Sequence, residues 1–118
     1  MALVLDPECR AVQDVWECYT VAESGRLVEL GTTLRMYDRA RGNWRIVFFS
    51  PVRGFVDTLV ADRAGDEIVL QGIGRSGNPC LWIFSDVERH SFQWREEETP
   101  DHGRSWRLIE VMKLTRQV

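Results

Sequence analysis

The chain has 118 residues, 44% of them hydrophobic and 28% charged, a composition typical of one globular domain over residues 1–118. The formal net charge of −3 argues against a nucleic-acid partner, because phosphate binding needs a surplus of Lys and Arg on one face. No stretch approaches the roughly 20 apolar residues of a membrane helix and the start lacks the regions of a signal peptide, so we expect a cytoplasmic protein with no membrane partner.

Apolar and polar residues alternate along most of the chain between turn residues, which is the pattern of antiparallel strands. The first strand is expected over Arg10–Thr20, with a helix as the alternative because the segment has no internal breaker. Ser24 and Gly25 then predict a turn. A short apolar run and a strand–loop–strand hairpin are expected next, over Leu27–Leu30, Thr32–Tyr37, Asp38–Gly42 and Trp44–Phe49.

Further strands separated by tight turns are expected in the second half of the chain. They are Phe55–Ala61, Glu67–Ile73, Cys80–Val87, His90–Glu97 and Ser105–Thr115. About seven or eight antiparallel strands and no long helix predict an all-β fold, an antiparallel up-and-down meander. Such a sheet curls to hide its edges, so we expect it to form a barrel.

The segment Thr99–Trp106, TPDHGRSW, lies between two of these strands and is expected at a hairpin tip. It is similar to the Asp-box of sialidase-type β-propellers. Each position that the pattern specifies can have a role in folding. Asp101 can accept hydrogen bonds from turn N–H groups, and Gly103 can take a positive φ. Trp106 can pack over the loop. A ring of propeller blades needs a far longer chain. The motif therefore predicts a braced turn and no glycosidase site.

The segment Gly72–Gly77 matches G-x-G-x-x-G, the pattern of phosphate-binding loops. Asn78 and Pro79 follow it, and then another strand, where a phosphate-binding helix should begin. We therefore expect a strand-to-strand loop and no nucleotide cofactor.

Histidine and cysteine residues form no recognisable site. His90 and His102 have no further ligands at metal-site spacing, so we expect neither a metal nor another cofactor. Cys9, Cys18 and Cys80 are an odd set with no CxxC pair, which is typical of free thiols in a reducing cytoplasm. A base that would activate one of them as a nucleophile is not apparent.

The acids of the last two strands predict two different environments. The run Glu96–Glu98 alternates across its strand and is interpreted as a solvated strand end. Glu110 shares a face with apolar residues by alternation, namely Trp106, Leu108, Met112 and Leu114. An acid on an apolar face must be paired, protonated or beside a cavity. We expect Glu110 to pair with Arg35 or Arg45 inside the barrel; in the alternative register it faces solvent.

The chain carries, in order, the segments RAVQDVW, GTTLRMYD, WRIVFFSP and FQWREEETPDHGRSWRLIEVMKLTR. This order resembles a family of small bacterial proteins of unknown function with a lipocalin-like (calycin-type) β-barrel, over roughly Arg10–Arg116. The resemblance implies an up-and-down barrel whose cavity holds one small ligand. Family members carry an extra strand or hairpin before RAVQDVW, so we expect an N-terminally short member with an incompletely closed barrel. An open edge invites pairing, and a homodimer is the expected outcome.

The function that we expect is binding of a small, mostly apolar ligand in the barrel. Tryptophan walls and a few polar anchors are what such a pocket needs. The candidate walls are Trp44, Trp82, Trp94 and Trp106, and the candidate anchors are Arg35, Arg45 and Glu110. Two alternatives stay open. One is a small enzyme acting on such a ligand with Glu110 as general acid or base. The other is a dimeric interaction or structural protein with a filled barrel.

Overall fold

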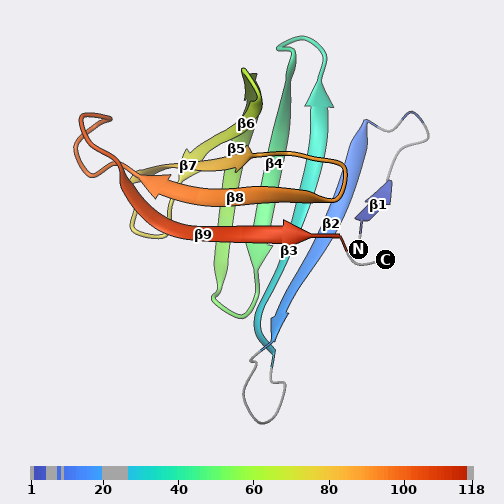
Figure 1. Ribbon diagram of the computed structural model, residues 1–118, viewed down its shortest axis with the longest axis horizontal. Helices are drawn as coiled ribbons and strands as arrows, with labels where there is room; N and C mark the ends of the chain where they lie inside the picture. Colours follow the sequence, from blue (N-terminus) through green and yellow to red (C-terminus); the bar gives the residue numbers. More distant parts are fainter. Residues whose placement is uncertain (1, 5–7, 9, 20–26, 117–118) are drawn as a thin grey trace. The chain divides into compact units, whose positions relative to one another are not determined.

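The computed structural model describes residues 2–4, 8, 10–19 and 27–116. These residues form nine β-strands and no helix. The strands are β1 (Ala2–Val4), β2 (Ala11–Tyr19), β3 (Leu27–Asp38), β4 (Asn43–Ser50), β5 (Phe55–Ala64), β6 (Glu67–Ile73), β7 (Pro79–Ser85), β8 (Ser91–Glu98) and β9 (Arg107–Thr115). Their order in the sheet is their order in the chain (Figure 1). The fold is therefore the all-β, antiparallel up-and-down meander that the alternation predicts, the topology of lipocalin-like barrels.

The strand predicted over Arg10–Thr20 is confirmed as β2, and the helical alternative is wrong. Strand β1, which was not predicted, precedes β2 and pairs with it from Ala2 opposite Asp14 to Val4 opposite Val12. A strand of three residues is too short for alternation to be recognised. The turn predicted at Ser24 and Gly25 lies outside the described residues. Over those that are described, no helix has the length and hydropathy needed to cross a bilayer.

Contacts divide the chain into two compact units, Met1–Leu59 and Val60–Val118. In the first unit, β3 is one continuous strand, although an apolar run and a separate strand were expected. Gly31 lies where the break was expected. A Cβ at this position would lie 2.6 Å from Cε2 of Phe48, so the missing side chain makes room for that ring. Gly31 allows close packing of β3 on the Phe48 side chain of β4 and does not end the strand.

The hairpin between β3 and β4 has the loop that was predicted over Asp38–Gly42. Oδ1 of Asp38 accepts hydrogen bonds from the backbone N–H groups of Ala40 (3.0 Å) and Arg41 (3.1 Å). The Arg41 N–H is the main cause that lowers the pKa of Asp38 below its ordinary value. Gly42 takes the positive φ of 69° that closes the loop. These bonds hold the turn in the geometry that Asp and Gly favour.

In the second unit, β7 lies between β6 and β8 and is buried on both faces. Cys80 is 2% exposed on one face, and Ile83 is 4% exposed on the other. The register pairs Leu70 of β6 with Trp82 and Val69 with Ile83, so each face of β7 continues into β6. Rows of side chains therefore cross the sheet from β6 through β7 to β8, and they place the rings of these strands side by side.

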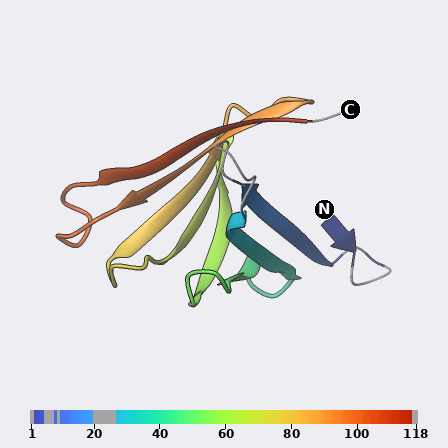
Figure 2. The same cartoon turned by 90° about the horizontal axis from the view of Figure 1, so that it is seen from below.

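A bulge separates the two ends of the β8–β9 ladder, which Figure 2 shows as a long hairpin in orange and red. The register pairs Glu96 with Glu110 but Glu97 with Leu108, so Ile109 is an extra residue on β9. One extra residue reverses the alternation beyond it. Leu108 therefore lies on the face opposite to Glu110, and the prediction that they share a face is wrong.

The turn at the tip of this hairpin confirms the structural interpretation of TPDHGRSW. The Oδ1 atom of Asp101 accepts a bond from the Ser105 N–H (2.8 Å), and its Oδ2 accepts one from the Ser105 hydroxyl (2.6 Å). The N–H of Gly103 donates to Oγ1 of Thr99 (2.7 Å), and Gly103 has a φ of 88°. Because the Asp101 carboxylate is engaged in bracing the turn, it has the role that its motif predicts. Trp106 is 41% exposed.

Candidate functional site

The second unit gathers aromatic rings on one face of β7 and β8. Trp82 and Trp94 meet edge to face, with ring centroids 5.8 Å apart and an interplanar angle of 73°. Phe84 and Phe92 continue the cluster at a centroid distance of 5.6 Å. All of these rings are partly exposed. We call this surface, made by Trp82, Phe84, Phe92 and Trp94, the aromatic face.

A carboxylate orients one ring of the aromatic face. The indole N–H of Trp82 donates a hydrogen bond to Oε2 of Glu96, at 3.1 Å. The two residues are direct partners in the β7–β8 register, so their side chains leave the sheet on the same side. Glu96 therefore satisfies the polar edge of the ring and holds its apolar surface in a fixed orientation.

Two neighbouring rows of register partners cross the aromatic face from β6 to β9. They are Leu70–Trp82–Glu96–Glu110 and Ile68–Phe84–Trp94–Met112. Glu110 is exposed at the end of its row. Among the residues that the structure describes, none forms a hydrogen bond or an ion pair with the Glu110 side chain. Glu110 thus belongs to the aromatic face and leaves its carboxylate to solvent.

Glu98, next in line on β8, is enclosed by the β6–β7 loop. It is only 6% exposed, and its Oε2 accepts a hydrogen bond from the Ser76 hydroxyl at 3.0 Å. A Cβ on Gly74 would clash with Oε1 of Glu98. The G-x-G-x-x-G segment is thus a strand-to-strand loop, as expected, that closes over a carboxylate. The interpretation of the Glu96–Glu98 run as a solvated strand end is wrong for Glu98, because this loop covers it.

The opposite face of the same strands holds an ion network of one base and two acids. Arg95 lies between two acids, with Nη1 3.3 Å from Oε2 of Glu67 and Nε 3.5 Å from Oε2 of Glu97. Nη1 also donates to the buried hydroxyl of Ser85 at 3.4 Å. This face therefore pairs its acids with a base, unlike the rows of the aromatic face.

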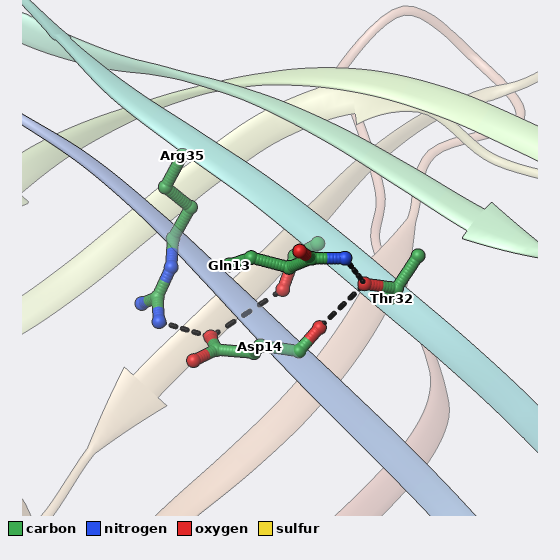
Figure 3. A network of polar contacts seen from close by, with 5 residues as sticks. Gln13, Asp14, Thr32 and Arg35 are labelled. Atoms are coloured by element: carbon green, nitrogen blue, oxygen red, sulfur yellow. Dashed lines mark hydrogen bonds and ion pairs between the residues drawn. The ribbon is translucent and has the colours of Figure 1, made fainter. Parts of the chain in front are cut away.

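In the first unit, Arg35 belongs to a polar network on β2 and β3 that is centred on Asp14 (Figure 3). Its Nη2 forms an ion pair with Oδ2 of Asp14, which also accepts a bond from the Thr33 hydroxyl at 3.4 Å. The Thr32 hydroxyl donates to the backbone carbonyl of Asp14 at 2.7 Å and accepts from Nε2 of Gln13 at 3.1 Å. The ion-pair partner of Arg35 is therefore Asp14, which neutralises its charge within β2 and β3.

The other candidates of the first unit are divided between its faces. Arg35 is the register partner of Ile46 on β4, and Trp44 lies two residues before Ile46 on the same face. Trp44 packs against Tyr37 with ring centroids 5.4 Å apart. Arg45 lies on the opposite face, with Nη1 3.8 Å from Oδ2 of Asp38. The first unit therefore places Arg35 and Trp44 on one face but not Arg45.

The second unit brings together three of the predicted site residues, Trp82, Trp94 and Glu110. Trp106 precedes β9 in the turn segment and is not part of the aromatic face. Glu96 and the pair Phe84–Phe92 were not predicted as site residues. The phenylalanines each lie two residues from a predicted tryptophan, and this spacing is the signal that could have found them.

No group of three or more His, Cys, Asp or Glu side chains among the described residues is arranged to hold a metal ion. Comparison with protein-family models, with curated proteins and with solved structures finds no match to this chain. The chain is an all-β meander that carries an aromatic face, with the carboxylates of Glu96 and Glu110 beside it.

Proposed function

We propose that this protein is a binding module for a small, mostly apolar ligand that lies against the aromatic face. The observation that carries the proposal is the edge-to-face pair of Trp82 and Trp94, partly exposed at the surface of the sheet. Large rings usually contribute most when they are buried, so a contiguous group of rings that is only partly buried is a candidate binding surface. The ring pair Phe84–Phe92 extends this surface.

Orientation of the rings before binding supports the proposal. The bond from the Trp82 indole to Glu96 holds one wall in place, so less side-chain freedom is lost when a ligand docks. An aromatic contact contributes about 0.5–1.5 kcal/mol beyond its buried area. Two indoles and a small apolar molecule are therefore sufficient for binding in the micromolar to millimolar range, about −8 to −4 kcal/mol.

The lipocalin-like resemblance and the cytoplasmic location belong to this proposal. Small-ligand binding is what the resemblance implies for an up-and-down barrel. Cys80 is a buried free thiol, which fits a reducing compartment. The enzyme alternative has weaker support, because Glu110 is exposed and acid–base chemistry gains most from groups shielded from bulk water.

The interaction-protein alternative is favoured by a different observation, on β9. Leu108, Ile109 and Val111 are 60%, 47% and 43% exposed, and β9 is the last strand in the sheet order. A strand at the end of a sheet presents unpaired backbone groups, and apolar side chains on it favour pairing with another chain. We propose that a second copy of this chain pairs along β9, which forms a homodimer.

The ligand proposal is tested by 15N NMR of the indole N–H groups, which report each of the five tryptophans separately. We expect the Trp82 and Trp94 signals to shift saturably when the neutral probe 2-naphthalenemethanol is added. The Trp106 signal is the internal control, because that ring lies outside the aromatic face, and it should stay in place. Equal shifts of all the indole signals, or no saturable shift, would contradict the proposal.

A further inference from the structure

From β6 to β9, the charged members of the two rows that cross the aromatic face are both acids. Glu96 and Glu110 are direct register partners on β8 and β9, so their Cβ atoms lie about 4.5–5.5 Å apart. The other members of the two rows that cross this face are uncharged: Leu70, Trp82, Ile68, Phe84, Trp94 and Met112. Like charges directly opposite one another destabilise a ladder, and a cation bound beside them would remove that repulsion.

Four basic side chains lie on β5 to β9. Arg63, the β5 partner of Ile68, is in line with the second row, and its Nε donates to the Gly65 carbonyl at 3.0 Å. Arg95 is the register partner of Ile83 and Val111, which places it on the opposite face. Lys113 lies on that face too, two residues after Val111. Arg107 is on the same side as Glu110, but its Nη2 lies 4.0 Å from the enclosed Glu98 carboxylate. Among the described residues, none of these bases is paired with Glu110.

Indole rings and carboxylates attract the same kind of group. The face of a tryptophan ring is electron-rich and binds ammonium ions within about 6 Å of its centroid. Trp82 and Trp94 provide such rings, and Glu96 and Glu110 lie in the adjoining row. A carboxylate ligand would meet repulsion at the same place.

We infer that the ligand of the aromatic face is an apolar amine, a small hydrophobic molecule that carries a protonated nitrogen. The inference rests on the proposed binding function and adds to it the sign of the ligand's charge. The apolar part lies against Trp82 and Trp94, and the ammonium group lies towards Glu110. Glu110 is the specificity-determining residue in this arrangement, because it is exposed and Glu96 already accepts the bond from Trp82.

Three probes that share one ring system test the charge preference by isothermal titration calorimetry. They are 2-naphthylmethylammonium, 2-naphthalenemethanol and 2-naphthoate. We expect the ammonium to bind about three- to tenfold more tightly than the alcohol, from one exposed cation–π contact and the nearby acids, and the naphthoate to bind least. The preference should decrease as NaCl is raised, because salt screens exposed charges.

Matched variants locate the preference. Glu110→Gln should reduce the preference for the ammonium to the part that the cation–π contact supplies, and it should leave the affinity for the alcohol unchanged. Glu97→Gln is the control, since it removes the same charge from the opposite face of β8, and it should keep most of the preference. Circular dichroism of both variants checks that the sheet is retained.

The outcomes separate the inference from the function on which it rests. Equal binding of the alcohol and the ammonium would overturn the inference and retain an apolar binding module. A preference that survives Glu110→Gln but is lost in Glu97→Gln would also overturn it. Saturable binding of none of the probes would overturn both.

Discussion

At the scale of single residues, a few polar side chains fix the loops that join the strands. Asp101 binds both the N–H and the hydroxyl of Ser105, and Glu98 anchors the β6–β7 loop through Ser76. The role of Asp101 could be predicted because its motif is local. The enclosure of Glu98 could not, because it depends on a loop more than 20 residues away folding back over β8, as the Ser76–Glu98 separation of 22 shows.

Asp101→Asn tests the turn through its pH dependence. The Ser105 hydroxyl and N–H lower the pKa of Asp101 below its ordinary value of 3.8. The folded pKa is lower than the unfolded one, so this stabilisation is fully present above the unfolded value and is lost as the pH falls through the folded value. We expect the melting temperature of the wild type to exceed that of the variant at pH 6, and the difference to shrink below pH 3.8.

Asp62→Asn, an exposed change on β5, is the control for this pH series. It should leave the melting temperature close to that of the wild type at pH 6. A difference between wild type and Asp101→Asn that does not change on acidification would contradict the role assigned to the carboxylate.

At the scale of elements, alternation was enough to predict most strands but not their interruptions. The strand Glu67–Ile73 has the bounds that were expected, because turn residues flank a clear pattern. The bulge at Ile109 could not be predicted, since one extra residue in an apolar strand leaves no local signal. Gly31 gave a false signal. Glycine is common at turns, so it suggested a break, but here it lies within β3 and leaves room for the Phe48 ring.

Gly31→Ala tests the close packing of β3 on β4. The new Cβ would lie 2.6 Å from Cε2 of Phe48, so the ring must move. We expect the variant to lose about 1–3 kcal/mol in the free energy of unfolding, as overpacked sites do, measured by urea denaturation. In a Phe48→Leu background the loss should be smaller, since the clashing ring atoms are absent. Equal losses in the two backgrounds would show that the Phe48 ring is not the cause.

At the scale of the whole molecule, we propose a binding module that assembles through its last strand, β9. The sequence allowed us to predict the meander, and three of the site candidates, Trp82, Trp94 and Glu110, lie on one side of its last strands. It could not show which strand faces coincide, because that depends on register. Alternation is unaltered by a shift of two residues, and such a shift changes every cross-strand partner.

The homodimer through β9 is tested by Val111→Lys, which puts a charge on an exposed apolar position of that strand. We expect light scattering after size exclusion to give twice the monomer mass for the wild type and the monomer mass for the variant, because a charged edge disfavours pairing. Thr115→Lys adds the same charge at the exposed end of β9 and should remain dimeric. A wild-type protein that stays monomeric at high concentration would contradict the assembly.

The most direct test of the central claim is a crystal structure of the protein with 2-naphthylmethylammonium bound. We expect the naphthalene ring in contact with the indoles of Trp82 and Trp94, and the nitrogen within hydrogen-bonding distance of Glu110. Density for the probe on the opposite face, beside Arg95, or an aromatic face left empty at saturating probe, would contradict it.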